Sequence, residues 1–147
     1  MRFAHTNIVA NNWKKLADFY IDVFGCTKKP PIRKQSGKWL EKGTGVPQAS
    51  LEGVHLLLPG YGENGPTLEI FTFSEIETNK PGPANRCGFA HIAFEVDDVQ
   101  ESAEKVKNYG GSFLGKITEK QIKGVGVISF IYARDPEGNI IELQSWK

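Results

Sequence analysis

The chain has 147 residues, which is the length of one ordinary domain. Its 18 Lys and Arg residues nearly balance 17 Asp and Glu residues, so the net charge of +1 lacks the basic excess expected of a nucleic-acid-binding protein. Hydrophobic residues make up 39% of the chain and aromatic residues 11%, which is enough for a packed core and excludes a fully disordered chain.

The first part of the chain predicts one helix among several strands. Phe3–Val9 is expected to be a strand, and Asn11 or Asn12 is expected to cap a helix that ends at Gly25. The apolar residues of this helix recur at i, i+3, i+4 and i+7, which is typical of an amphipathic helix. Further strands are predicted at Lys28–Ile32, Ala49–Leu58 and Thr67–Phe73.

The second part of the chain predicts the same order of elements. Gly88–Val96 is expected to be a strand, the acidic pair Asp97-Asp98 to cap a helix, and Gly110-Gly111 to end it. Three more strands are predicted at Phe113–Thr118, Val125–Ala133 and Ile140–Trp146. The sequence therefore predicts a single α+β domain over residues 1–147, with one module at 1–74, a linker at 75–87 and a second module at 88–147.

Two pairs of landmarks indicate that the modules are copies of one βαβββ unit. Phe3-Ala4-His5 recurs 86 residues later as Phe89-Ala90-His91. Gly65–Ile70 matches Gly138–Leu143, which begins 73 residues later. The two offsets differ by 13 residues, which predicts an insertion in the first copy, and its polar, glycine-rich site is Arg33–Ala49.

The alternation of side chains along a strand places a His and a Glu on one face of each copy. If the first and last strands of a copy are neighbours, His5 lies on the same face as Glu69, and His91 on the same face as Glu142. A carboxylate in the middle of an apolar strand is costly to bury without a partner. Two imidazoles and two carboxylates suit one divalent ion of Ni, Zn, Co, Mn or Fe. Alternatively, each pair is only a satisfied His–Glu contact.

Three other features leave alternatives open. His55 has no counterpart in the second copy, where the 73-residue offset gives Ile128, and is predicted to be a packed strand histidine. Phe73 and Trp146, each four residues beyond a predicted metal-binding Glu, either wall a substrate pocket together with Phe71 or are ordinary core aromatics. The insertion around Trp39 is expected to be a solvated loop, with a lid over the site as the alternative.

The sequence resembles the vicinal oxygen chelate superfamily, which includes glyoxalase I, methylmalonyl-CoA epimerase, extradiol dioxygenases and bleomycin-resistance proteins. The resemblance covers nearly the whole chain. It is carried by His5-Thr6, Leu16–Gly25, Leu68–Ile70, Gly88–Phe94 and Asp135–Leu143. It implies paired βαβββ modules whose mixed sheets curve into a funnel around a metal ion.

All four metal-ligand positions of glyoxalase I are matched, by His5, Glu69, His91 and Glu142. The resemblance therefore implies a lyase or isomerase of the lactoylglutathione lyase type that stabilises an enediolate, with Glu142 as general base and Glu69 as its partner or a second base. Two positions that hold glutathione in bacterial glyoxalase I do not match. Val9 occupies the position where an Arg is expected, and Phe73 the position where an Asn is expected. The resemblance therefore does not extend to glutathione as the substrate carrier.

Two other functions remain open at this stage: a non-catalytic binding or antibiotic-resistance module, and an iron-dependent dioxygenase. The expected partners are a small-molecule substrate and a second copy of the chain in a homodimer, since each module presents a sheet edge that needs covering. Neither nucleic acid nor a membrane is expected, because Phe3–Trp13, the longest stretch without a charged residue, is too short to span a bilayer. Two cysteines without a secretory pattern predict a cytoplasmic protein.

Overall fold

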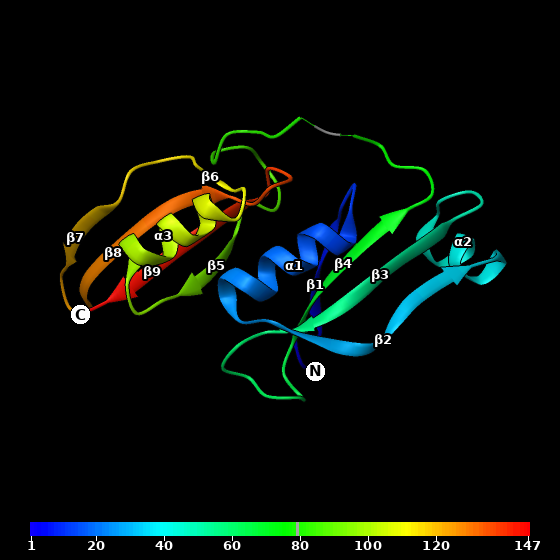
Figure 1. Ribbon diagram of the computed structural model, residues 1–147, viewed down its shortest axis with the longest axis horizontal. Helices are drawn as coiled ribbons and strands as arrows, with labels where there is room; N and C mark the ends of the chain where they lie inside the picture. Colours follow the sequence, from blue (N-terminus) through cyan, green and yellow to red (C-terminus); the bar gives the residue numbers. More distant parts are fainter. Residues whose placement is uncertain (79) are drawn as a thin grey trace. The chain divides into compact units, whose positions relative to one another are not determined.

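The computed structural model describes residues 1–78 and 80–147. The chain divides into two compact units, Met1–Asn79 and Lys80–Lys147, each with its own sheet and helix (Figure 1). The boundary falls inside the predicted linker 75–87, in which Asn79 lies outside the described residues.

Unit 1 is a four-stranded mixed sheet with one long helix on it. The strands lie in the order β1-β4-β3-β2, with β1 parallel to β4 and the other pairs antiparallel. The elements in chain order are β1 (His5–Val9), α1 (Trp13–Phe24), β2 (Thr27–Ser36), α2 (Lys38–Thr44), β3 (Ser50–Leu57) and β4 (Thr67–Phe73).

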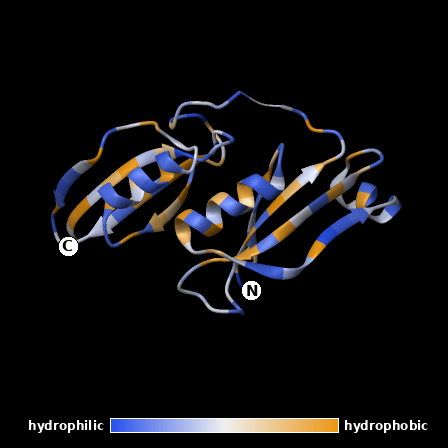
Figure 2. Cartoon of the chain, in the orientation of Figure 1, coloured by the Kyte–Doolittle hydropathy of each residue, from blue (hydrophilic) through white to orange (hydrophobic). Residues whose placement is uncertain are grey.

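Local signals in the sequence explain both ends of α1. The side chain of Asn12 accepts a hydrogen bond from the backbone N–H of Lys15, which satisfies one of the free donors of the first turn. Gly25 ends the helix at a φ of 70°, a left-handed conformation that favours glycine. The apolar stripe of α1 packs onto β3 and β4, and Figure 2 shows hydrophobic and hydrophilic residues alternating along it.

Unit 2 repeats this arrangement around a five-stranded sheet of order β5-β9-β8-β6, with β7 also paired to β8. The helix α3 packs on β8 and β9 through Val99, Ala103 and Val106. The side chain of Asp98 caps it by accepting from the N–H of Glu101. The elements are β5 (Ile92–Glu95), α3 (Val99–Asn108), β6 (Ser112–Phe113), β7 (Thr118–Ile122), β8 (Gly126–Arg134) and β9 (Ile140–Trp146).

A tight turn fixes the register of β8 and β9. Asp135 is buried, and its carboxylate accepts hydrogen bonds from the N–H groups of Glu137 and Asn139 and from the Asn139 side chain. Arg134 donates to the carbonyl of Gly138 across the same turn. This hairpin places Glu142 directly opposite Tyr132.

The α+β class and the repeated βαβββ order are confirmed, with corrections to individual elements. The strand predicted at Gly88–Val96 is limited to Ile92–Glu95, because its pairing with β9 begins at Ile92. The strand predicted at Lys28–Ile32 extends over Thr27–Ser36, because its pairing with β3 resumes at Arg33. The single strand predicted at Phe113–Thr118 is divided into β6 and β7, because the N–H groups of Leu114 and Gly115 both donate to the carbonyl of Tyr132 and interrupt the ladder there. The insertion Arg33–Ala49, expected to be a loop, contains α2. That the two sheets form one funnel stays a prediction. No helix in the described residues is long and apolar enough to cross a membrane.

Candidate functional site

The candidate site begins on the face of the unit 1 sheet that is turned away from α1. On the α1 side, Leu56, Leu68 and Ile70 are fully buried. The other face, called the open face here, presents the alternate residues of each strand. Its members on β1, β3 and β4 are His5, Asn7, Val9, Leu51, Gly53, His55, Leu57, Thr67, Glu69, Phe71 and Phe73.

Glu69 is the centre of a three-residue cluster on this open face. Its Oε1 lies 3.2 Å from Nδ1 of His5 on β1 and 3.2 Å from Nδ1 of His55 on β3. His55 stands directly opposite Glu69 in the β3–β4 ladder, whereas His5 lies diagonally from it, since Asn7 is the residue opposite Glu69 on β1. The carboxylate side chain is 11% exposed, so the prediction that it has a partner is confirmed.

His55 is a packed strand histidine, as predicted, but the sequence did not reveal that it also contacts Glu69. Its ring packs edge-to-face against Phe71, with the ring centroids 5.8 Å apart. Burial lowers the pKa of His55 below its ordinary value, and the charges of Arg33, His5 and Lys29 act in the same direction. The carboxylate of Glu69 opposes them.

The second predicted pair, His91 and Glu142, lies in unit 2 at the strand positions equivalent to those of His5 and Glu69. His91, which immediately precedes β5, places its Nε2 2.9 Å from Oε2 of Glu142. Glu142 stands opposite Ala93 on β5, as Glu69 stands opposite Asn7 on β1, so both histidines reach their glutamates diagonally. The repeat inferred from the sequence is therefore present at the level of these side chains.

The residue equivalent to His55 in unit 2 is Tyr132, and the Ile128 given by the 73-residue offset is wrong. Tyr132 faces Glu142 across the β8–β9 ladder as His55 faces Glu69. Its ring packs instead on His91, with the ring centroids 4.8 Å apart. The residue opposite the glutamate therefore contacts the carboxylate in unit 1 but packs on the histidine in unit 2.

The four predicted metal ligands form two His–Glu pairs, one in each unit. Two imidazole nitrogens and two carboxylates are a donor set that fits a borderline divalent ion. Within the described residues, no three His, Cys, Asp or Glu side chains are arranged to hold a metal ion. In the unit 1 cluster, both imidazoles direct Nδ1 at the same carboxylate oxygen, so the three groups bind one another. Metal binding by all four residues stays a prediction.

The aromatic residues predicted to wall the pocket have different surroundings. Phe71 is buried in a cluster with Leu40 of α2, Ala49 and Leu51, and Phe73 packs against this cluster. Added bulk at Gly53 would meet the Phe71 ring and the carbonyl of Ile70, so the glycine makes room for that ring. The insertion helix α2 thus packs on the open face of unit 1 at its Phe73 end.

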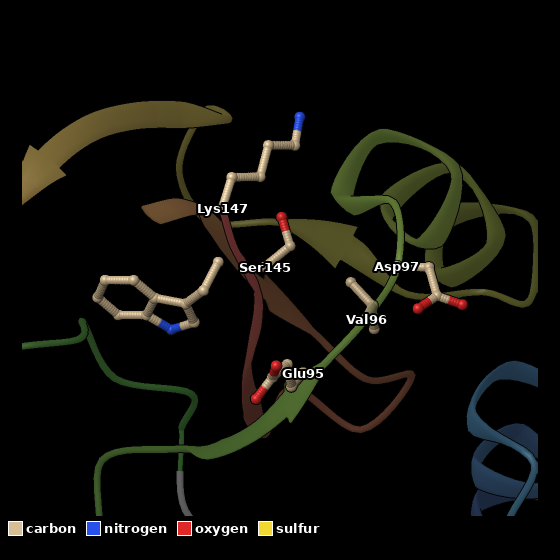
Figure 3. Close-up of a pocket in the computed structure, with 6 residues that line it drawn as sticks. Glu95, Val96, Asp97, Ser145 and Lys147 are labelled. Atoms are coloured by element: carbon tan, nitrogen blue, oxygen red, sulfur yellow. The ribbon is translucent and has the colours of Figure 1, made fainter. Parts of the chain in front are cut away.

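Trp146 lines a hollow of about 390 Å³ in unit 2. The hollow lies where β5 and β9 end, and Figure 3 shows Glu95 on one strand and Ser145 on its neighbour. Glu95 and Trp146 belong to the face of the sheet that carries Glu142, because residues two apart on a strand share a face. The remaining lining residues are Val96, Asp97 and Lys147.

Comparison with protein-family models and with curated relatives shows the family of the chain. Residues 2–143 match the model of the Glyoxalase/Bleomycin resistance protein/Dioxygenase superfamily. A protein of Neisseria meningitidis named lactoylglutathione lyase is 30% identical over 97% of this chain and 88% of its own length. A Synechocystis protein named probable lactoylglutathione lyase is 27% identical over 97% and 94%, respectively.

Among solved structures, a glyoxalase family protein from Bacillus cereus superposes with a TM-score of 0.84. The match covers 99% of this chain and 94% of that one at 19% identity, a level that shows the fold alone. Because the family model matches residues 2–143, the chain belongs to the Glyoxalase/Bleomycin resistance protein/Dioxygenase superfamily.

Proposed function

We propose that the protein is a glyoxalase-like, metal-dependent lyase or isomerase that acts on a small hemithioacetal or 2-oxo thioester. The observation that carries the proposal is the repeated His–Glu pair. His5 with Glu69 and His91 with Glu142 lie at equivalent strand positions, and both glutamates have little exposure to solvent. These positions are the ones that the resemblance to glyoxalase I assigns to metal ligands, and relatives named lactoylglutathione lyase match almost the whole chain.

The cofactor that we propose is one divalent ion of Ni, Zn, Co, Mn or Fe, bound by His5, Glu69, His91 and Glu142. When bound, such an ion would polarise two neighbouring oxygens of the substrate and stabilise the negative charge of an enediolate. The two histidines must be neutral to offer a nitrogen lone pair to the ion.

Glu142 is the general base in this proposal, and its environment supports that choice. Among the described residues, its carboxylate contacts one imidazole, that of His91, whereas the carboxylate of Glu69 contacts two. A carboxylate with fewer partners reorients at lower cost. Glu142 would therefore take the proton from one substrate carbon and return it to the adjacent carbon.

The carrier part of the substrate is proposed to differ from glutathione. Val9 is half-exposed on the open face and offers no positive charge to a carboxylate. Phe73 packs against the cluster of Leu40, Ala49, Leu51 and Phe71 and offers no hydrogen-bond donor from its side chain. Hemithioacetals of a 2-oxoaldehyde with several thiols are therefore the substrates to compare, with glutathione among them.

The test uses the full chain, stripped with a chelator and reloaded with each metal in turn. Isomerisation is measured together with incorporation of solvent deuterium at the substrate carbon. We expect metal-dependent activity that falls by more than about 100-fold in Glu142→Gln, a loss at the lower end of general-base effects. Glu119→Gln on β7, an exposed carboxylate, is the matched control and should keep full activity. Full activity in Glu142→Gln would overturn the base assignment, and no turnover with any metal would overturn the reaction class.

Binding of a small molecule without catalysis is the second candidate. The hollow beside Trp146 is the observation that favours it, since an aromatic side chain and a concave surface are common in ligand sites. This candidate predicts that a ligand quenches tryptophan fluorescence equally with and without a chelator. Loss of binding on chelation would count against it.

A further inference from the structure

His55 is the third residue of the Glu69 cluster, yet the proposed reaction gives it no role. Its Nδ1 is as close to Glu69 Oε1 as that of His5, at 3.2 Å. Its side chain is 21% exposed, against 47% for His5, so the contact made by His55 is the more shielded of the two.

The 3.2 Å contact between His55 Nδ1 and Glu69 Oε1 lies within hydrogen-bonding distance. An ionised carboxylate only accepts hydrogen bonds, so a hydrogen bond at this contact requires that Nδ1 of His55 carries the proton and donates it. The ring is held by its place opposite Glu69 in the β3–β4 ladder and by the edge contact with Phe71. Asn7 holds β1 against the same strand position through a bond from its Nδ2 to the backbone carbonyl of Glu69.

The second copy lacks this arrangement. At the equivalent position Tyr132 packs on the His91 ring, and His91 is the imidazole that contacts Glu142. Glu69 is thus contacted from two neighbouring strands, whereas within the described residues the imidazole contact of Glu142 comes from His91. The two carboxylates are therefore held unequally.

We propose that His55 is a positioning residue whose Nδ1–H···Oε1 bond holds Glu69 as the fixed carboxylate of the site. The proposal rests on the proposed function in that Glu69 is taken to be a metal ligand. Hydrogen-bonding partners of metal ligands orient the ligand, and their loss weakens metal affinity by about 10- to 100-fold. The difference in role between Glu69 and Glu142 then follows from the side chain of His55.

The first test measures metal affinity of the full chain by competition with a chromophoric chelator. His55→Phe keeps a ring beside Phe71 but removes the donor, and we expect it to bind Zn²⁺ about 10- to 100-fold more weakly. His55→Asn offers an amide N–H close to the Nδ1 position and should recover most of the loss. In a Glu69→Gln background, His55→Phe should cause no further loss, because His55 acts through Glu69. Unchanged affinity in His55→Phe, or the same loss in both backgrounds, would overturn the proposal.

The second test needs no metal and separates the two proposals. Long-range ¹H–¹⁵N correlations of the metal-free protein report which nitrogen of His55 is protonated. We expect the Nδ1–H form in the wild-type chain and its loss in Glu69→Leu. An Nε2–H form in the wild type would overturn the positioning role even if the protein binds metal. Absence of metal binding combined with the Nδ1–H form would instead overturn the proposed function and leave the hydrogen bond established.

Discussion

His55 and Tyr132 occupy the same position in the two copies of the βαβββ unit, each directly opposite a glutamate of the last strand. His55 contacts the glutamate itself, whereas Tyr132 packs on the histidine that contacts the glutamate. A duplicated framework therefore carries two unequal carboxylates. This difference is the structural basis for assigning a fixed role to Glu69 and a mobile one to Glu142.

The lowered pKa of His55 predicts a pH dependence of stability. A histidine whose pKa is lower in the folded than in the unfolded state binds fewer protons when folded, so its contribution is complete above the unfolded value of 6.5 and is lost as pH falls below it. Urea unfolding between pH 5 and 8 should show wild-type stability falling on the acid side more steeply than that of His55→Asn. Parallel curves for the two proteins would contradict the shift.

The two cysteines are expected to differ sharply in reactivity. Cys26 is 1% exposed, and burial raises the pKa of its thiol to about 11, so almost no thiolate forms at pH 8. Cys87 is exposed. A thiol reagent at pH 8 should modify one cysteine per native chain and two per unfolded chain. Cys87→Ser should abolish the native reaction, and rapid modification of Cys26 in the native state would show that its surroundings are more open.

Gly53 is expected to resist substitution because the backbone carbonyl of Ile70 and the Phe71 ring occupy the space beside it. Gly53→Ala forces Phe71 or β4 to move and should destabilise the protein by about 1–3 kcal/mol, as overpacking does elsewhere. Gly115→Ala is the control, since nothing lies near a Cβ at that position and its φ is ordinary. Thermal unfolding compares the two variants. An equal change in Tm for both would show that the packing around Phe71 does not require a glycine at position 53.

The helix N-caps predicted from the sequence should each contribute measurably to the free energy of unfolding. Asn12→Ala removes the acceptor of the Lys15 N–H and should cost about 1 kcal/mol of unfolding free energy. Asp98→Ala, at the equivalent cap of α3, should cost a similar amount. Chemical denaturation measures both. A neutral result for Asn12→Ala would mean that the first turn of α1 is satisfied by water instead.

The sequence was sufficient for features that depend on local rules. The bounds of Thr67–Phe73 and Ile140–Trp146 were predicted to the residue, because apolar and polar side chains alternate between clear turn signals. The placement of His5 with Glu69 and of His91 with Glu142 followed from the same alternation once the first and last strands were taken as neighbours.

Features that depend on loop length and on packing were missed. The offset of 73 residues aligns β4 with β9, but the segment 58–66 before β4 is longer than the segment 135–139 before β9, so the offset gives the wrong partner for His55. Counting outward from each hairpin would have paired it with Tyr132. The helix α2 buries only Leu40, so its seven residues carry too little apolar pattern to be recognised.

The metal content of the purified protein tests the central claim most directly. The account predicts one divalent ion per chain, lost on substitution of a histidine from either unit, as in His5→Ala and His91→Ala. Lys28→Ala on the outer edge strand is the control and should retain the ion. A wild-type protein that takes up no divalent ion, or an ion retained in both histidine variants, would contradict the account.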